Sequence, residues 1–498
     1  MNVNPITRLD YPDPDVIRVE DTYYMVSTTM HFMPGCEILQ SFDLVHWEHV
    51  TYVYETLDHT DAQQLKSGQN IYGQGMWAAS LRYHEGRFYI CFVANDTRKT
   101  YLYTSEKIDG PWKKQLIEGF YHDGSLLFDE DGRNYIVYGN DEIWITELNE
   151  DLTAPKKDGL HRLLVSDHKN PELGYEGSHI QKINGYYYIF LIHSLRDRWM
   201  RTEACFYSDS LEGEFTGGDV LCDDRGYCGQ GVAQGGIVDT PDGKWYAMLF
   251  QDSGAVGRIP ILLPVTWKDH FPVFGQNGHV PEEIEVHSTR PGYIYQPLVG
   301  SDDFCNGLLP RWQFNHDPDP QYYHLDALQG TYTITTREVC TELTQAVNTL
   351  TQRMSYPSCA AEVTVDASAL KEGDVAGLCA LQSCYAAVGI TKHHGKYEVL
   401  MLDKKEDGIL DMTEGTVVES HQMDFRLEAD FCNMKDEARC YYRVNKGDWL
   451  PIGTVHKLYF KLDHFTGCRF GLFCYAAEET GGSACFRDFK YYDVDEIS

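Results

Sequence analysis

Apolar and polar residues alternate around a glycine turn in a unit that this chain repeats. The clearest copy is HDGSLLFDEDGRNYIVYG, from His122 to Gly139. In it the pair Asp131-Gly132 separates two runs rich in apolar and aromatic residues. This pattern predicts a β-hairpin closed by an Asp-Gly turn.

Four more copies of the hairpin unit are present. WAASLRYHEGRFYI begins at Trp77, EGSHIQKINGYYYI at Glu176 and QGGIVDTPDGKWYA at Gln234, each with a glycine at the turn and a tyrosine on the returning strand. The copy PDPDVIRVEDTYYM opens the chain, one residue out of register, with Asp21 at its turn. Repeats of this length are typical of four-stranded blades, so residues 1–295 are predicted to form a five-bladed β-propeller.

The pattern changes in the last two fifths of the chain. From residue 300 onward the repeat is lost and short alternating segments follow at sandwich-like spacing, with no sustained helical period. The last of them is expected to pair near the start of this region. Residues 300–498 are therefore predicted to form a β-sandwich of the concanavalin or jelly-roll kind, and the whole chain is predicted to be all-β. The expected strands are 359–365, 375–381, 385–390, 397–402, 458–462, 468–475 and 484–492.

The propeller geometry brings distant residues together. The innermost strand of each blade runs along the central channel, so equivalent positions in the five repeats converge on one axis. The sequence therefore predicts a pocket that contains three acids and an aromatic residue. The equivalent positions are Asp13, Trp77, Asp123, Glu176 and Gln234.

Three converging carboxyl groups suit the hydrolysis of a glycosidic bond. That reaction needs one protonated carboxyl group to donate to the leaving oxygen and one carboxylate to activate water. Glu176, with its longer reach, is the better donor, and Asp13 would be the base, although Asp15 lies on the same face and competes for the role. Asp123 would raise the pKa of the acid by like-charge repulsion. Each acid alone is more simply a turn cap or a solvated loop residue, but together at equivalent positions they favour catalysis.

The net charge and the composition of the chain indicate which classes of molecule it binds. A net charge of −33 argues against nucleic acid, which needs clustered Lys and Arg, and favours a neutral oligosaccharide substrate. The N-terminus shows no basic segment followed by an apolar run, and no stretch is long enough to span a bilayer. The 15 cysteines lack CxxC pairs and are expected to be reduced. A cytoplasmic location is therefore expected, with no membrane partner.

The repeats and their flanks resemble a known family. NPITRLDYPDPDVIRVEDTYYMVSTT and HFMPGCEILQSFDLVHW resemble the opening of glycoside hydrolase family 43, and SDDFCNGLLPRWQFNHDPD resembles the start of the accessory sandwich of its xylan-directed members. The resemblance implies an inverting hydrolase of arabinofuranosides or xylosides. It assigns Asp13 as general base, Glu176 as general acid and Asp123 as the acid that tunes pKa and orientation. Inversion requires the carboxyl groups of Asp13 and Glu176 to lie roughly 6.5–9.5 Å apart.

The resemblance also implies substrate and metal contacts. Arg290 matches an arginine that reaches the hydroxyls of the terminal sugar; a surface ion pair is the alternative. Gln234 stands where many members have a histidine near a calcium or water cluster, so one structural Ca²⁺ on the axis is expected, with a purely hydrogen-bonded glutamine as the alternative. His31, Phe32 and Trp77 are expected to line the pocket, where aromatic rings stack on sugars; burial in the core is the alternative.

The favoured function is an exo-acting α-L-arabinofuranosidase that trims arabinoxylan-derived oligosaccharides. The opening PDPDVIRV and the segment AVGRIPILLPVTW look more like that branch than like dedicated β-xylosidases. A β-D-xylosidase, or an enzyme with both activities, is the main alternative. A carbohydrate-binding propeller without catalysis and an endo-arabinanase are further alternatives, the latter disfavoured by the sandwich.

Overall fold

The computed structural model describes residues 2–413 and 415–493, and within these ranges the chain is almost entirely β. This confirms the all-β prediction. None of the described helices has the length and apolar character needed to cross a membrane. The helical segments of the described chain are the 3-10 turns Lys66–Gly68, Gly254–Val256, Leu343–Gln345 and Cys432–Met434.

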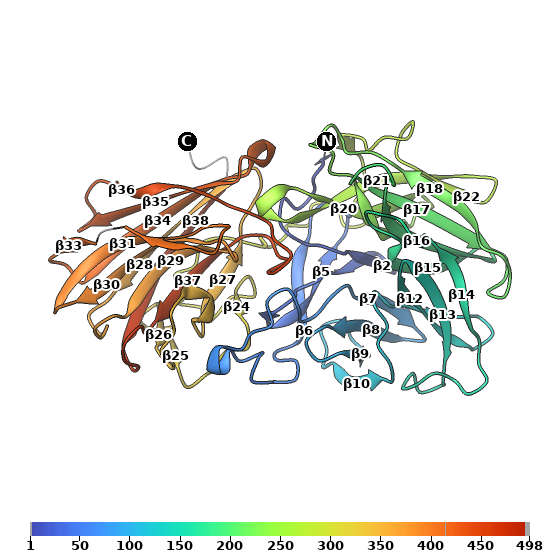
Figure 1. Ribbon diagram of the computed structural model, residues 1–498. Helices are drawn as coiled ribbons and strands as arrows, with labels where there is room; N and C mark the ends of the chain where they lie inside the picture. Colours follow the sequence, from blue (N-terminus) through green and yellow to red (C-terminus); the bar gives the residue numbers. More distant parts are fainter. Residues whose placement is uncertain (1, 414, 494–498) are drawn as a thin grey trace.

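Five four-stranded antiparallel sheets are arranged around one axis and form the propeller on the right of Figure 1. The first three blades consist of β2 (Asp15–Val19), β3 (Thr22–Val26), β5 (Gly35–Ser41) and β6 (Glu48–Tyr54); β7 (Ser80–His84), β8 (Arg87–Ala94), β9 (Lys99–Ser105) and β10 (Lys113–Ile117); and β11 (Ser125–Phe128), β12 (Asn134–Asn140), β13 (Glu142–Leu148) and β14 (His161–Ser166). The last two consist of β15 (Glu176–Ile183), β16 (Tyr186–Ser194), β17 (Arg201–Ser208) and β18 (Thr216–Leu221); and β19 (Ala233–Asp239), β20 (Trp245–Asp252), β21 (Arg258–Lys268) and β22 (Phe271–Phe274).

The repeated hairpins are the two inner strands of each blade. Their turn glycines, such as Gly86 (φ 77°) and Gly132 (φ 82°), have the left-handed conformation that a tight hairpin needs. Each first strand contacts the first strand of the next blade, and β19 contacts β2, so the ring of inner strands closes. The predicted radial arrangement of the five hairpins is therefore confirmed.

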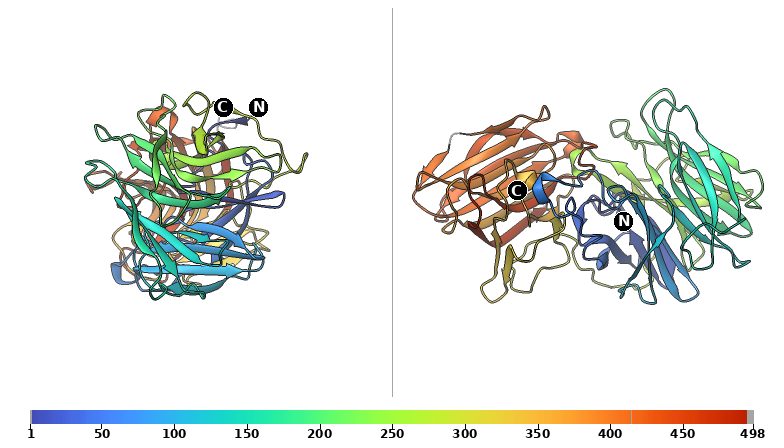
Figure 2. Two further views of the ribbon diagram at one scale, coloured as in Figure 1. Left: turned by 90° about the vertical axis from the view of Figure 1, so that its right-hand side faces the viewer. Right: turned by 60° about the horizontal axis from the view of Figure 1, so that its bottom comes forward.

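The sandwich lies beside the propeller in Figure 1 and in the right-hand view of Figure 2. Its last strand pairs with β26 near the start of the domain, as the sequence predicted. One sheet contains β24 (Gln313–Asn315), β27 (Leu350–Arg353), β37 (Arg469–Tyr475), β29 (Val375–Leu381), β30 (Ala386–His393), β31 (Lys396–Lys404), β32 (Leu410–Met412) and β33 (Thr416–Val418). The other contains β25 (Tyr323–Asp326), β26 (Thr331–Thr335), β38 (Ser483–Asp493), β28 (Ser358–Asp366), β34 (Gln422–Asp430), β35 (Glu437–Val444) and β36 (Leu450–Lys457).

Short segments at the domain boundary depart from the predicted pattern. The strand expected at 458–462 is wrong, because β36 ends at Lys457 and the following residues form a loop that reaches the propeller. Conversely, β4 (Phe32–Met33) leaves the first blade and pairs with β24 of the sandwich. The two domains therefore share a sheet. A separate two-stranded sheet pairs β1 (Asn2–Val3) with β23 (Glu283–Ile284).

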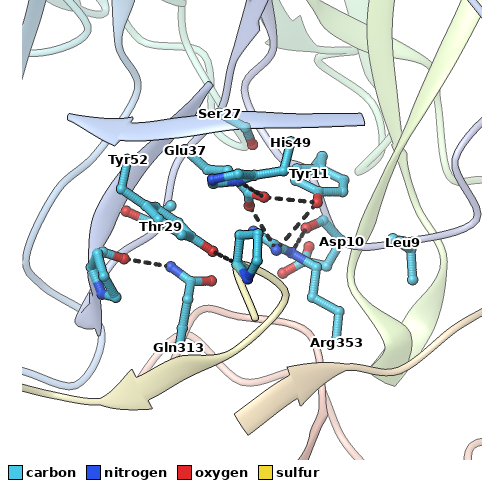
Figure 3. Close-up of polar contacts among 12 residues, drawn as sticks. Leu9, Asp10, Tyr11, Ser27, Thr29, Glu37, His49, Tyr52, Gln313 and Arg353 are labelled. Carbon is cyan, nitrogen blue, oxygen red and sulfur yellow. Dashed lines mark hydrogen bonds and ion pairs between the residues drawn. The ribbon is translucent and has the colours of Figure 1, made fainter. Parts of the chain in front are cut away.

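A buried arginine fastens the sandwich to the propeller (Figure 3). Arg353, at the end of β27, donates from Nε to the carbonyl oxygen of Asp10 (2.9 Å) and from Nη1 to Glu37 Oε2 (2.9 Å) and the Tyr11 hydroxyl (3.3 Å). Burial opposes the ionisation of Glu37, but Arg353 and His49 more than offset it and lower the pKa of Glu37 to about 2. The pair is charged at neutral pH.

Arg353→Met should lower the free energy of unfolding at neutral pH by about 3–5 kcal/mol, because it removes the guanidinium that pairs with the buried Glu37 carboxylate. Since the pKa of Glu37 falls from 4.5 to about 2 on folding, its contribution to stability is present above pH 4.5 and is lost as pH falls toward 2. The difference in unfolding free energy between the wild type and Arg353→Met should therefore become smaller at acid pH. Denaturant unfolding across pH measures this. Arg439→Met, at a partly exposed pair with Glu437, is the control, and an equal loss in both variants would contradict the assignment.

Candidate active site

A cavity of about 420 Å³ opens at one end of the propeller axis. The first residues of all five repeats line it, as the predicted convergence requires. The loop after β36 of the sandwich adds Leu462 and Phe465 to the lining. The propeller residues at these equivalent positions are Asp13, Trp77, Asp123, Glu176 and Gln234.

The backbone has an unusual conformation where the acids enter the pocket. Asp13 (φ 52°), Asp123 (φ 48°) and Gln234 (φ 63°) adopt left-handed dihedrals that residues other than glycine rarely take. In the fourth blade Gly177 (φ 65°), directly after Glu176, takes this conformation instead. The same backbone conformation therefore recurs at or next to the equivalent positions of four blades, at the end of the channel where the cavity lies.

The carboxylate of Asp13 lines the pocket and accepts hydrogen bonds from two neighbouring side chains. It is 7% exposed, and it accepts hydrogen bonds from Thr28 Oγ1 (2.5 Å) and Arg258 Nη1 (3.2 Å). Asp15, which the sequence offered as a competitor, is 1% exposed and is bound on the axis by Arg82. Because Asp15 does not line the pocket, Asp13 alone of the pair can meet a ligand there.

Glu176 and Asp123 lie on either side of a histidine. Asn140 Nδ2 donates to Glu176 Oε2 (2.8 Å), and the backbone N–H of Gly177 donates to Asp123 Oδ2 (3.1 Å). His122 Nε2 lies 3.5 Å from Glu176 Oε2 and 3.4 Å from Asp123 Oδ2. One imidazole thus bridges the two carboxyl groups.

The charges in this group are strongly coupled. Burial raises the pKa of Asp123 to about 6; His122 opposes the rise, while Glu176 and Asp13 add to it by repulsion. Burial acts to lower the pKa of His122, but the carboxylates of Asp123 and Glu176 outweigh it and raise that pKa to about 9. His122 is therefore a cation at neutral pH, and Asp123 changes its charge close to neutrality.

Asp123→Asn should lower activity and remove an inflection from the acid limb of the pH profile. In the wild type the Asp123 carboxylate gains a proton as pH falls through about 6, whereas asparagine has no proton to gain there. A series of kcat/KM values from acid to alkaline pH measures the change. Asp129→Asn, a carboxylate on the same hairpin that binds Lys182 and not the pocket, should leave the profile unchanged. An unaltered acid limb in Asp123→Asn would overturn the tuning role.

His31 and Phe32 do not line the pocket, so their predicted role in sugar stacking is wrong. His31 has no exposed surface and packs against Phe32, with ring centroids 4.3 Å apart, and against His316 and His464 of the sandwich. Phe32 lies beneath the guanidinium of Arg469, 3.5 Å from its ring centroid. Because β4 pairs with the sandwich, both side chains are enclosed between the domains. Trp77, in contrast, lines the cavity.

Arg290 lies outside the pocket, so its predicted contact with the sugar is also wrong. It donates from Nε to Asp21 Oδ2 (2.8 Å), and its guanidinium lies 4.1 Å from the centroid of the Phe42 ring. Asp21 is at the turn of the first hairpin, the opposite end of β2 from Asp13. The alternative, a surface ion pair, is what the structure contains.

Two arginines line the pocket, Arg201 and Arg258, and the sequence analysis named neither of them. Arg258 is the one that contacts Asp13. It begins β21, is 3% exposed and lies 4.4 Å from the centroid of the Phe465 ring. Within the described part of the chain its Nε and Nη2 have no hydrogen-bond acceptor, so they are available to ligand hydroxyls. An arginine at the start of the apolar run AVGRIPILLPVTW was the available sign. His122 directly precedes the repeat position Asp123, and the spacing of the repeats does not distinguish it.

Gln234 lies in the pocket wall. Its backbone N–H donates to Glu203 Oε2 (2.7 Å), and its side chain is close to Gly177, where an added Cβ would lie 2.7 Å from Gln234 Cδ. The side chain of Gln234 is therefore packed closely against Gly177 of the fourth blade.

Comparison with known sequences decides the family. The model for "Glycosyl hydrolases family 43" matches residues 3–272, and the model for the "Beta xylosidase C-terminal Concanavalin A-like domain" matches residues 301–492. The chain belongs to glycosyl hydrolase family 43. It is a glycoside hydrolase, as the repeats and acids suggested.

Relatives within family 43 include proteins named for two different sugars. A beta-xylosidase of Formosa agariphila is 26% identical over 99% of this chain and 89% of its own length. A non-reducing end alpha-L-arabinofuranosidase of Bacteroides ovatus is 24% identical over 82% of this chain and 79% of its own. The solved structure of a bifunctional GH43-CE protein of Bacteroides eggerthii is 42% identical and matches all of this chain with a TM-score of 0.93. The present chain spans 64% of the length of that protein.

Proposed function

We propose that this family 43 hydrolase is exo-acting and inverting, and that it removes a terminal α-L-arabinofuranosyl or β-D-xylosyl group from neutral, xylan-derived oligosaccharides. One observation carries the proposal: three carboxyl groups and the unpartnered donors of Arg258 share a cavity that a sandwich loop covers on one side. A cavity of this kind accepts a chain end more readily than the middle of a polymer.

Glu176 acts as the general acid. Asn140 and His122 fix its Oε2, which leaves the carboxyl group oriented for donation to the glycosidic oxygen of the leaving sugar. Asp123 accepts the N–H of Gly177, the residue after Glu176, and shares His122 with Glu176, so it helps to hold the acid in position.

Asp13 acts as the general base on a water molecule at the opposite face of the sugar. The Thr28 hydroxyl and Arg258 fix the carboxylate, so it accepts the water proton without rearrangement. Arg258 also offers Nε and Nη2 to the sugar hydroxyls. The separation of roughly 6.5–9.5 Å that inversion requires stays a prediction, which the anomer of the first product tests by NMR.

The preferred sugar is decided by assays on separate substrates. The first hairpin and the segment that begins at Ala255 favour arabinofuranosides, and relatives named for β-xylosidase favour the other sugar. Aryl α-L-arabinofuranoside and aryl β-D-xyloside should be assayed separately, followed by a mixed arabinoxylo-oligosaccharide. Rapid xylose release with little arabinose would overturn the arabinoside preference. Comparable rates would identify a dual enzyme, and inactivity toward both sugars would overturn the proposal.

The sandwich loop is the structural reason to expect exo action. Leu462 is 75% exposed at the rim and Phe465 lies beside Arg258, so together they limit the space beyond the terminal sugar. A rapid fall in the viscosity of linear arabinan or xylan before free pentose accumulates would contradict exo action.

A further inference from the structure

One arginine side chain joins the inner strands of the propeller. Arg82 donates from Nε to the carbonyl oxygen of Leu126 (2.8 Å) and from Nη1 to Asp15 Oδ2 (2.8 Å). Its Nη2 donates to Ser125 Oγ (2.7 Å) and to the carbonyl oxygen of Ile180 (3.2 Å). Arg82 belongs to the second blade, and these acceptors belong to the first, third and fourth. A single guanidinium reaches four inner strands only from the axis that they surround.

Two further contacts complete the ring. His179 Nδ1 lies 3.0 Å from Asp15 Oδ1, and Gln181 Nε2 donates to the carbonyl oxygen of Ile237 in the fifth blade (2.7 Å). Asp15 also accepts the backbone N–H of Leu81 (2.7 Å). Burial opposes its ionisation, but Arg82 and His179 more than offset that and lower the pKa of Asp15. The axis thus contains an ionised carboxylate with a guanidinium as its counter-charge.

These residues do not fit the calcium ion expected on the axis. Calcium takes six to eight oxygen ligands at about 2.3–2.6 Å. Here the Asp15 carboxylate and two axial carbonyl oxygens already bind a guanidinium, whose positive charge would repel a second cation. The one described group of His, Cys, Asp and Glu donors close enough to share an ion is His122, Asp123 and Glu176, at the catalytic site.

We infer that Arg82 is the resident cation of the propeller axis: its guanidinium takes the structural role that a bound calcium would have, and the fold needs no metal ion there. Its planar fork reaches acceptors on separate strands at once, as the several oxygen ligands of a metal ion would. The inference does not depend on which sugar the pocket accepts.

The first test uses the wild-type full-length chain. Its metal content is measured by mass spectrometry as purified, without chelator, and its Tm is then compared in chelator and in millimolar calcium chloride. The inference expects no stoichiometric calcium and the same Tm in both. A ligand that binds only the native state raises Tm. Stoichiometric calcium, or a rise of several degrees in calcium chloride, would overturn the inference.

The second test compares two arginine variants at the same end of the channel. Arg82→Met should lower Tm by about 5–10 °C, because it leaves Asp15 buried without a counter-charge and frees acceptors on three blades. Arg18→Met is the control, since Arg18 joins β2 only to Asp239 of the fifth blade and is partly exposed. Equal Tm values for the two variants would overturn the inference. If Arg82→Met does not fold, the metal measurement on the wild type still decides.

Discussion

Glu176→Gln should lower kcat on unactivated oligosaccharides by roughly a hundredfold to ten-thousandfold, while oligosaccharide binding is retained. Glutamine keeps the shape of the side chain and can still accept the Asn140 hydrogen bond, but it has no proton to donate. A leaving group that needs no protonation depends less on the general acid. The loss on a dinitrophenyl glycoside should therefore be much smaller than on the oligosaccharide.

The comparison of substrates separates catalysis from general damage to the pocket. Glu85→Gln, at the exposed turn of the second hairpin, is the matched control and should behave like the wild type. Equal losses on both leaving groups would remove Glu176 from the role of acid. Calorimetric binding with no turnover in the wild type would point instead to a carbohydrate-binding propeller.

Asp13→Asn should lower kcat by roughly a thousandfold on both activated and unactivated substrates, because water must be deprotonated whatever group leaves. Asparagine is the appropriate replacement, since it tolerates the left-handed conformation of this residue and can still accept the hydrogen bond from Thr28. Measuring kcat and KM on both substrate classes checks the expectation.

Asp21→Asn is the control for Asp13→Asn, because it lies at the far end of the same hairpin and binds only surface groups. It should leave kcat unchanged. An Asp13→Asn enzyme that loses activity on the oligosaccharide and keeps it on the dinitrophenyl glycoside would exchange the assigned roles of Asp13 and Glu176.

The register of the repeats predicted those site residues that occupy equivalent positions in the blades. Equivalent positions in a closed ring of hairpins must converge, so counting residues from each turn was enough to bring Trp77, Glu176 and Gln234 to one cavity. The acids at Asp13 and Asp123 were found in the same way, because their neighbours in sequence follow the hairpin pattern.

Contacts that depend on three-dimensional docking could not be predicted this way. Phe465 reaches the pocket from a loop whose apolar residues favoured a strand in the sequence. His31 is enclosed because the two-residue strand β4 pairs with the sandwich domain. The resemblance placed Arg290 in the sugar pocket, but in the structure it binds the carboxylate of Asp21 instead. Arg258, one of the two arginines that line the pocket, is held there by Asp13, a contact between the two ends of the propeller sequence.

The pairing of β4 with β24 bears on how the protein can be made and reused. During translation β4 leaves the ribosome long before its partner strand, so the edge of this two-residue strand stays unpaired until β24 has been added. Shuffling the catalytic half alone into a chimera would leave that edge open permanently and prone to aggregation. We therefore expect the two halves to be transferable between enzymes only as one piece.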